Sequence, residues 1–171
     1  MEIAPIYTDR QQLRLAADTI MTNTLPFWGG APIDQAVDVL DADLSWLLNL
    51  SESQGNDFEL GGHGWPSDGY FEGVGEASAD NQQQYIAEPY CYLQSKGWPY
   101  YLFADIDNDW RQVQDPGDTI EGNWGFLGAD STLESHFVDY GFTCDDGTVW
   151  NIPELAAADI DTTNILVSSE L

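Results

Sequence analysis

The stretch "PIDQAVDVLDADLSWLLNL", residues 32–50, decides the expected fold class because its apolar residues recur at helical spacing. Pro32 suits the first position of a helix. The aspartates fall mainly outside the apolar stripe, which consists of Ile33, Ala36, Val37, Leu40, Leu44, Leu47 and Leu48. Residues 32–50 are therefore predicted to form an amphipathic helix that packs on a core.

A second helix is predicted just before this one, in "TDRQQLRLAADTIMTNT", residues 8–24. Thr8 and Gln11 have the spacing of a capping box. Apolar residues again recur at helical spacing, at Leu13, Ala16, Ala17, Ile20 and Met21. The N-terminal part of the chain is therefore expected to be helical.

After residue 55 the sequence becomes rich in glycine, aromatic residues and turn dipeptides, with short alternating runs typical of antiparallel strands. Asp146-Gly147 predicts a hairpin turn. Residues 153–171 are expected to add a helical turn and a last strand, or to extend onto a neighbour. The predicted strands are 57–60, 69–74, 84–93, 99–106, 110–114, 136–144 and 148–152.

These elements predict an α+β fold in which two N-terminal helices pack against a mainly antiparallel β-sheet, sandwich or small barrel. The chain is expected to form a single domain over residues 1–171, with a helical part in 1–54 and a β-rich part in 55–171.

Charge is the strongest compositional feature. The sequence contains 30 Asp and Glu but only 4 Lys and Arg, which gives a net charge of −26. Direct binding to nucleic acid needs basic side chains, so it is disfavoured, as is an anionic membrane surface. No apolar run reaches the roughly 18 residues of a membrane helix, and no secretory signal is visible at the start. Adaptation to high salt, mimicry of nucleic acid, and binding of a basic partner or divalent cations each account for the acidic surface.

Three aspartates at alternate positions, Asp105, Asp107 and Asp109, resemble the start of a calcium loop. Trp110 replaces the required glycine and Pro116 the required glutamate, so the EF-hand motif fails. A hairpin turn between strands 99–106 and 110–114 is the preferred interpretation, since Asp and Asn favour turns. The alternative is a calcium site at the three aspartates, completed by Asp115 or Asp118. No other cofactor is predicted.

The histidines and cysteines give weaker signals. His63 lies in "GGHGWPSDGY", residues 61–70, which is interpreted as an exposed, turn-rich loop rather than a binding loop. His136 is expected to be a packed or surface residue of a strand. Cys91 and Cys144 form either two buried thiols or one disulfide, and the lack of a visible secretion signal favours thiols.

Hydrolase motifs such as GxSxG and HExxH are absent from the sequence. Pairs of carboxylates are too frequent here to indicate a glycosidase. The many aromatic residues are expected to pack in a core, with a sugar-stacking platform as the alternative; they include Trp65, Trp98, Trp110, Trp124 and Trp150.

The sequence therefore predicts a non-enzymatic structural or interaction protein with a high-salt-adapted surface. Its expected form is a virion component, such as a capsid-decoration, head–tail connector or tail protein, of a virus with a halophilic or marine host. It would assemble with other protein subunits, as a homo-oligomer or hetero-assembly. A cytoplasmic, nucleic-acid-mimicking inhibitor of a host DNA-binding or defence protein is the alternative. A carbohydrate-binding module or an unrecognised enzyme comes third.

Overall fold

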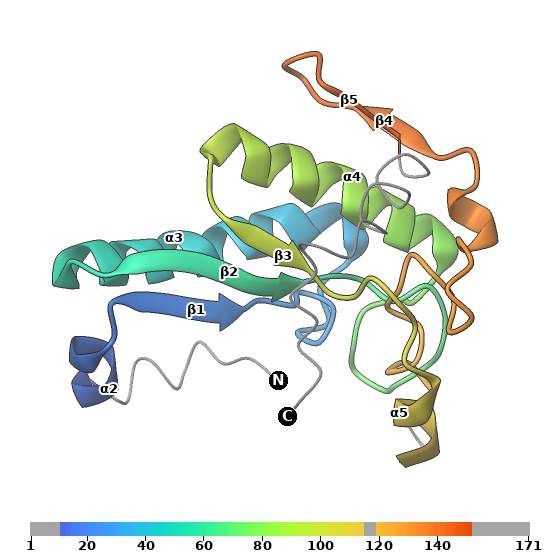
Figure 1. The fold of residues 1–171 in the computed structure, drawn as a ribbon, viewed down its shortest axis with the longest axis horizontal. Coiled ribbons are helices and arrows are strands. Elements are labelled where there is room, and N and C mark those ends of the chain that lie inside the picture. The colour runs from blue at the N-terminus through green and yellow to red at the C-terminus, as the bar shows by residue number, and fades with distance from the viewer. Residues whose placement is uncertain (1–10, 115–118, 152–171) are drawn as a thin grey trace.

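The computed structural model describes residues 11–114 and 119–151, and its centre is a sheet of three parallel strands (Figure 1). The strands lie in the order β1 (Thr19–Asn23), β2 (Asp57–His63) and β3 (Tyr100–Leu102). Parallel neighbours need long crossover connections, which are usually helices. Here α3 (Ala36–Gln54) joins β1 to β2, and α4 (Ala79–Lys96) joins β2 to β3. The chain thus contains two consecutive β–α–β units.

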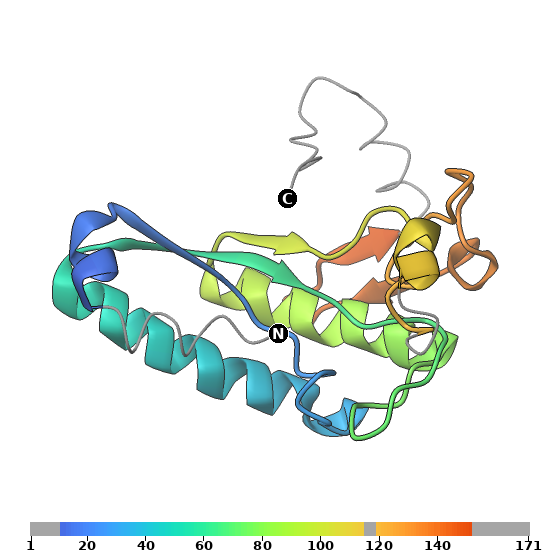
Figure 2. The ribbon, with the colours of Figure 1, turned by 90° about the horizontal axis from the view of Figure 1, so that it is seen from below.

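Both long helices cover the same face of the sheet (Figure 2). The core between the helices and the sheet is formed by Ile20, Phe58 and Leu60 from the strands and by Leu40, Leu44, Leu47 and Leu93 from the helices. The helix predicted over residues 32–50 is present as α3, preceded by a 3₁₀ turn at Ile33–Gln35. It ends at Gly55, whose φ of 73° is the left-handed conformation that glycine adopts most easily.

The strand predicted over residues 84–93 is wrong, because this segment lies within α4. Ser78 caps that helix by accepting a hydrogen bond from the Asn81 N–H, and Gly97 ends it with a φ of 67°. Its buried residues recur at helical intervals, at Gln82, Tyr85, Ile86, Pro89, Tyr90 and Leu93. Aromatic residues favour strands in general, but here they share one face of a helix.

The helix predicted over residues 8–24 is wrong beyond Ala16. Within the described residues it is confined to α2 (Gln11–Ala16), and Thr19–Asn23 forms strand β1. Exposed and buried side chains alternate along β1, with Ile20 and Thr22 buried. Ile20 and Met21 fit the spacing of a helix as well as that of a strand, so the apolar pattern of this short segment did not distinguish the two. Thr8, the predicted cap, lies outside the described residues.

The predicted hairpin around Asp107 is also wrong. β3 pairs with β2 in parallel, with Leu60 opposite Tyr100, and the returning segment is helix α5 (Asp109–Gln114). Residues 69–74 form a loop instead of a strand. The expected α+β class with a mainly antiparallel sheet is therefore contradicted: the sheet that organises the chain is parallel, as in (β/α) barrels.

Antiparallel pairing occurs in the short hairpin of β4 (Gly141–Thr143) and β5 (Val149–Asn151), where Phe142 lies opposite Trp150. Asp146-Gly147 lies in its turn, as predicted, and Gly147 has a φ of 86°. Another 3₁₀ turn, Ser135–Phe137, precedes the hairpin. The elements predicted for residues 153–171 lie outside the described part of the chain.

A disulfide joins Cys91 of α4 to Cys144 of the hairpin, with the two Cα atoms 5.3 Å apart. The prediction of free thiols is therefore wrong. The sequence contains no local signal for this pairing, because α4 was not expected and the two cysteines are 53 residues apart. In the part of the chain that the structure describes, no helix has the length and apolar character needed to cross a membrane.

Candidate functional site

The carboxyl ends of β1, β2 and β3 point the same way and end at one edge of the sheet (Figure 1). Ligands of parallel α/β folds bind at this edge, in the loops that follow the strands. The loops after the strands are joined by backbone hydrogen bonds. The Thr24 N–H donates to the Gly62 carbonyl (3.1 Å), and the Phe103 N–H donates to the His63 carbonyl (2.8 Å).

Aromatic rings from all three strand-end loops meet at this edge. Phe27 is in edge-on contact with Trp65 and Trp124, at centroid distances of 5.2 and 5.5 Å. Trp28 contacts Trp124 at 5.9 Å and Phe71 at 6.2 Å. We call this set the aromatic edge; it consists of Phe27, Trp28, Trp65, Phe71, Phe103 and Trp124.

The aromatic edge runs from the core to the surface. Trp65 and Trp124 are buried, as the core-packing interpretation predicted, and they support the outer rings. Trp28 is half-buried and Phe71 is 45% exposed. Tyr70 lies next to Phe71 in the chain and is 74% exposed. The outer rings therefore offer an apolar surface to a ligand.

A small pocket lies in the loop that carries Phe71. Its volume is about 270 Å³, and its lining consists of Gly69, Tyr70, Phe71, Gly73, Val74, Gly75, Glu76 and Ala77. The exposed carboxylate of Glu76 and two exposed rings are thus present on one loop. The motif of residues 61–70 singled out in the sequence includes Gly69 and Tyr70 of this lining, but not Phe71 or Glu76.

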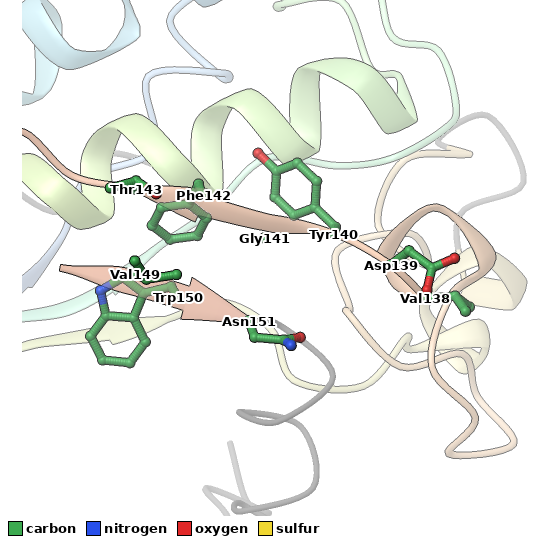
Figure 3. A pocket seen from close by; sticks show the side chains of 9 residues that line it. All are labelled: Val138, Asp139, Tyr140, Gly141, Phe142, Thr143, Val149, Trp150 and Asn151. Atoms are coloured by element: carbon green, nitrogen blue, oxygen red, sulfur yellow. The ribbon is translucent and has the colours of Figure 1, made fainter. Parts of the chain in front are cut away.

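A larger pocket, of about 520 Å³, lies at the β4–β5 hairpin (Figure 3). Phe142 and Trp150, which line it, both contact Tyr90 of α4, at ring centroid distances of 5.6 and 4.4 Å. These rings therefore hold the hairpin on the helix. The pocket is remote in the chain from the strand-end loops.

Two glycines allow the strand ends to lie close together. A Cβ at Gly64 would lie 1.8 Å from the Phe103 carbonyl oxygen, and one at Gly125 would lie 2.4 Å from the Asp107 N. Both obstacles are backbone atoms, which cannot move aside as a flexible side chain can. Glycine at these positions therefore fixes how closely the loops pack.

His63 does not face the solvent. It is fully buried at the end of β2, and its ring lies near Tyr85 and Tyr100, at centroid distances of 5.8 and 5.5 Å. Burial lowers the pKa of His63 to about 3, so the ring is neutral at pH 7. The prediction of an exposed loop is wrong here, and His63 is not placed to act on an external ligand.

Asp107 is half-buried in the segment after β3, where its carboxylate accepts a hydrogen bond from the Gly125 N–H (2.7 Å). The pKa of Asp107 is raised to about 6: burial is the largest cause, the hydrogen bond from Gly125 opposes it, and the nearby charges of Glu134 and Asp109 add to the rise. Asp105 and Asp109 are exposed. Asp107 therefore titrates closer to neutral pH than a typical aspartate.

The described residues do not provide a set of side chains that could bind calcium together. Among the residues it describes, no three His, Cys, Asp or Glu side chains are placed to hold a metal ion. Asp115 and Asp118 lie outside those residues. Calcium binding at Asp105, Asp107 and Asp109 stays a prediction, which calorimetric titration of the protein and of its triple Asp→Asn variant tests.

Comparison with known proteins identifies the fold and its relatives. Residues 2–125 match the model of the BtgE/BtgC glycoside hydrolase domain. A glucan 1,3-β-glucosidase of Schizosaccharomyces pombe is 29% identical over an alignment of 125 residues, which covers 70% of this chain and 37% of the relative. The chain thus spans well under half of that relative's length.

Solved structures agree with this assignment. An active-site mutant of the Rhizomucor miehei β-1,3-glucanosyltransferase in complex with laminaritriose is 28% identical, with a TM-score of 0.61 over 70% of this chain and 42% of that one. A glycoside hydrolase family 17 β-1,3-glucanosyltransferase from the same organism has a TM-score of 0.64 at 22% identity, over 78% of this chain and 54% of that one. The parallel strands and crossover helices described above thus have the arrangement of part of a glycoside hydrolase fold.

These matches overturn the functional predictions. The virion component of a halophilic or marine virus, its virion location and its non-enzymatic character are all contradicted by the match to a glycoside hydrolase domain. Acidic composition described the surface but did not identify a function. From the match over residues 2–125 and the parallel β–α–β architecture, we conclude that the chain belongs to the BtgE/BtgC glycoside hydrolase domain family.

Proposed function

We propose that this chain is a carbohydrate-active domain that binds β-1,3-glucan at the aromatic edge and takes part in cleavage of its glycosidic bonds. The observation that carries the proposal is the position of the aromatic edge, at the carboxyl ends of the parallel strands, where this fold class binds ligands. The relatives' names supply the substrate class, since they include a glucan 1,3-β-glucosidase and a glucanosyltransferase in complex with laminaritriose.

The chemistry of the edge suits a neutral sugar chain. Sugar rings have apolar C–H faces that pack against aromatic side chains, and binding pockets combine such apolar surfaces with a few polar groups. Phe71 and Tyr70 offer exposed rings, and Glu76 offers a hydrogen-bond acceptor on the same loop. A glucan carries no charge, so the net charge of −26 does not repel it.

Cleavage of a glycosidic bond generally requires two carboxyl groups on either side of that bond. The last residues of the three strands, Asn23, His63 and Leu102, carry none. Asp107 meets the requirement most closely, because it follows β3 and its pKa is raised to about 6, as suits a proton donor. A second carboxyl group would then come from beyond these strand ends.

Glucan binding is testable by titrating the protein with laminaritriose and following tryptophan fluorescence or heat. We expect saturable binding, and we expect Phe71→Ala to weaken it about tenfold, which corresponds to about 1.4 kcal/mol of lost ring contact. Trp46→Ala is the matched control, because Trp46 is an aromatic residue of α3 with similar exposure, 42% against 45% for Phe71. Absence of binding, or an equal loss in the two variants, would contradict the proposal.

The disulfide bears on where the protein works. Disulfides persist in oxidising compartments and are rare in the cytosol. The Cys91–Cys144 bond therefore supports passage through a secretory or extracellular compartment, in place of the predicted virion or cytoplasm. Alkylation of the protein purified from its native source, without reductant, tests this: two blocked thiols would contradict it.

A further inference from the structure

The residues Asn49-Leu50-Ser51 of α3 form an acceptor triplet for N-linked glycosylation. In such a triplet an asparagine is followed by any residue except proline and then by serine or threonine. The whole sequence contains no other triplet of this kind. Short patterns also arise by chance, so the surroundings of Asn49 decide whether it can carry a sugar.

Asn49 lies on the side of α3 that faces the solvent (Figure 2). Its side chain is exposed, whereas Leu44 and Leu47 of the same helix are buried against the sheet. The Asn49 Nδ2 donates a hydrogen bond to the Ser45 carbonyl one turn earlier (2.8 Å). A side-chain amide has two N–H groups, so this bond can persist when a sugar replaces the other hydrogen. The folded helix therefore accommodates a glycan at this position.

An exposed tryptophan lies beside Asn49. Trp46 is 42% exposed, although it belongs to a helix that packs on the core. Residues three apart are neighbours on the surface of a helix, and side chains lean towards the N-terminus, so the Asn49 side chain leans towards Trp46. Because the apolar face of a sugar packs on an aromatic ring, Trp46 offers the first sugar of a glycan a surface to cover.

Ser51 determines when the triplet can be modified. In the folded chain its side chain is only 1% exposed, and its hydroxyl donates to the Leu48 carbonyl (2.9 Å). A glycosyltransferase that recognises this hydroxyl cannot reach it once α3 has formed. The sugar would therefore be added to the unfolded chain, and folding would then place Asn49 at the surface.

A glycan at Asn49 would leave the aromatic edge free. The first residue of α3, Ala36, packs in one cluster with Phe27 and Trp65. Asn49 lies on the order of 20 Å further along the helix, at about 1.5 Å per residue. The triplet is thus near the end of α3 that leads into the start of β2, away from the carboxyl ends of the strands.

We propose that Asn49 carries an N-linked glycan whose first sugar packs on Trp46. The inference rests on the proposed passage through a secretory compartment, which the Cys91–Cys144 disulfide supports. The donor is an oligosaccharide linked to a lipid through pyrophosphate. A bond forms between the Asn49 Nδ2 and the anomeric carbon of the first sugar, while the bond from that carbon to the pyrophosphate breaks. The lipid pyrophosphate leaves, and one amide proton passes to a base of the transferase.

The first experiment uses the protein purified from its native source. The peptide that contains Asn49 is analysed by mass spectrometry before and after treatment with peptide N-glycosidase in heavy-oxygen water. We expect an added sugar mass that the treatment removes, which leaves an aspartate labelled with heavy oxygen at this position.

Variants secreted from yeast test the triplet and the contact with Trp46. Asn49→Gln and Ser51→Ala should lose the glycan, and Ser51→Thr should keep it. Ser53→Ala is the matched control and should keep it too, because its hydroxyl makes the same kind of bond, to the Leu50 carbonyl (2.7 Å), outside the triplet. A tryptophan-specific reagent should label Trp46 more in Asn49→Gln than in the wild type, with unchanged labelling of Trp110, which is 54% exposed.

Three results would overturn the proposal: an unmodified Asn49 in native protein whose cysteines are oxidised, a glycan that Ser51→Ala retains, or equal labelling of Trp46 in the wild type and Asn49→Gln. Two other measurements read the proposed function separately. Alkylation reports the state of the disulfide, and Asn49→Gln should bind laminaritriose as the wild type does, because the triplet is remote from the aromatic edge. Failure of the glycosylation proposal is therefore distinguishable from failure of secretion or of glucan binding.

Discussion

Replacing both Cys91 and Cys144 with serine is expected to lower the free energy of unfolding by about 4 kcal/mol. The bond closes a loop between residues 53 apart in sequence, and cross-linking a loop of that size restricts the unfolded chain by about this amount in the loop-entropy model. Urea denaturation of the wild type and the double variant, followed by tryptophan fluorescence, measures the difference directly.

The position of the bond makes the effect large. It joins α4, which lies within the family match over residues 2–125, to a hairpin that lies beyond it. Without the disulfide, the described contacts between hairpin and helix are mainly the rings of Phe142 and Trp150 on Tyr90. We therefore also expect faster hydrogen exchange of the hairpin amides in the variant.

Ser95→Ala is the control for the disulfide variant, because Ser95 is an exposed residue of the same helix whose hydroxyl donates to the local Tyr92 carbonyl. It should change stability by less than about 0.5 kcal/mol. A loss below about 1 kcal/mol in the double variant would show that the rings alone hold the hairpin.

The sequence predicted the elements whose signals are local. Helix α3 has a long apolar stripe, and the β4–β5 turn has Asp146-Gly147. The parallel sheet was not predictable in the same way, because an alternating pattern does not state which strand is its neighbour or in which direction it runs. β3 is only three residues long, and its pairing with β2 depends on α4 between them.

The aromatic edge was not predicted from the sequence, for a related reason. Phe27, Trp65 and Trp124 come from three loops that are far apart in the chain, and only the parallel sheet brings them to one edge. The sequence was searched for catalytic side chains at fixed spacing, and the last residues of the three strands, Asn23, His63 and Leu102, carry no carboxylate. The three spaced aspartates attracted attention as a motif, but Asp107 acts in the structure as a backbone-bonded, half-buried carboxyl.

His63 should make the protein sensitive to acid. Its pKa is about 3 in the folded chain and 6.5 in the unfolded one, because burial disfavours the charged ring. Below pH 6.5 the unfolded state therefore binds a proton that the folded state does not, and stability falls as the pH decreases from 6.5 towards 3. The full effect is about 4–5 kcal/mol, at about 1.4 kcal/mol per pH unit.

His63→Phe should remove this sensitivity. The ring lies between Tyr85 and Tyr100, and within the described residues neither of its nitrogens has a hydrogen-bond partner, so phenylalanine loses no bond there. At pH 7 we expect the variant to be as stable as the wild type or more stable. At pH 4 it should be more stable by several kcal/mol, measured by urea denaturation at both pH values.

The other histidine provides the control for this experiment. His136 also has a lowered pKa from burial, but it is only half-buried, the charges of Glu134 and Asp80 counteract the lowering, and its Nε2 bonds to Gln82. His136→Gln should therefore change the pH dependence much less than His63→Phe. Two results would contradict the explanation: an equal change of the pH dependence in the two variants, or a His63→Phe variant that still loses stability between pH 7 and pH 4 as the wild type does. Burial of a neutral His63 would then not be the cause of the acid sensitivity. The acidic residues, which the wild type and the variants share, would have to account for the loss.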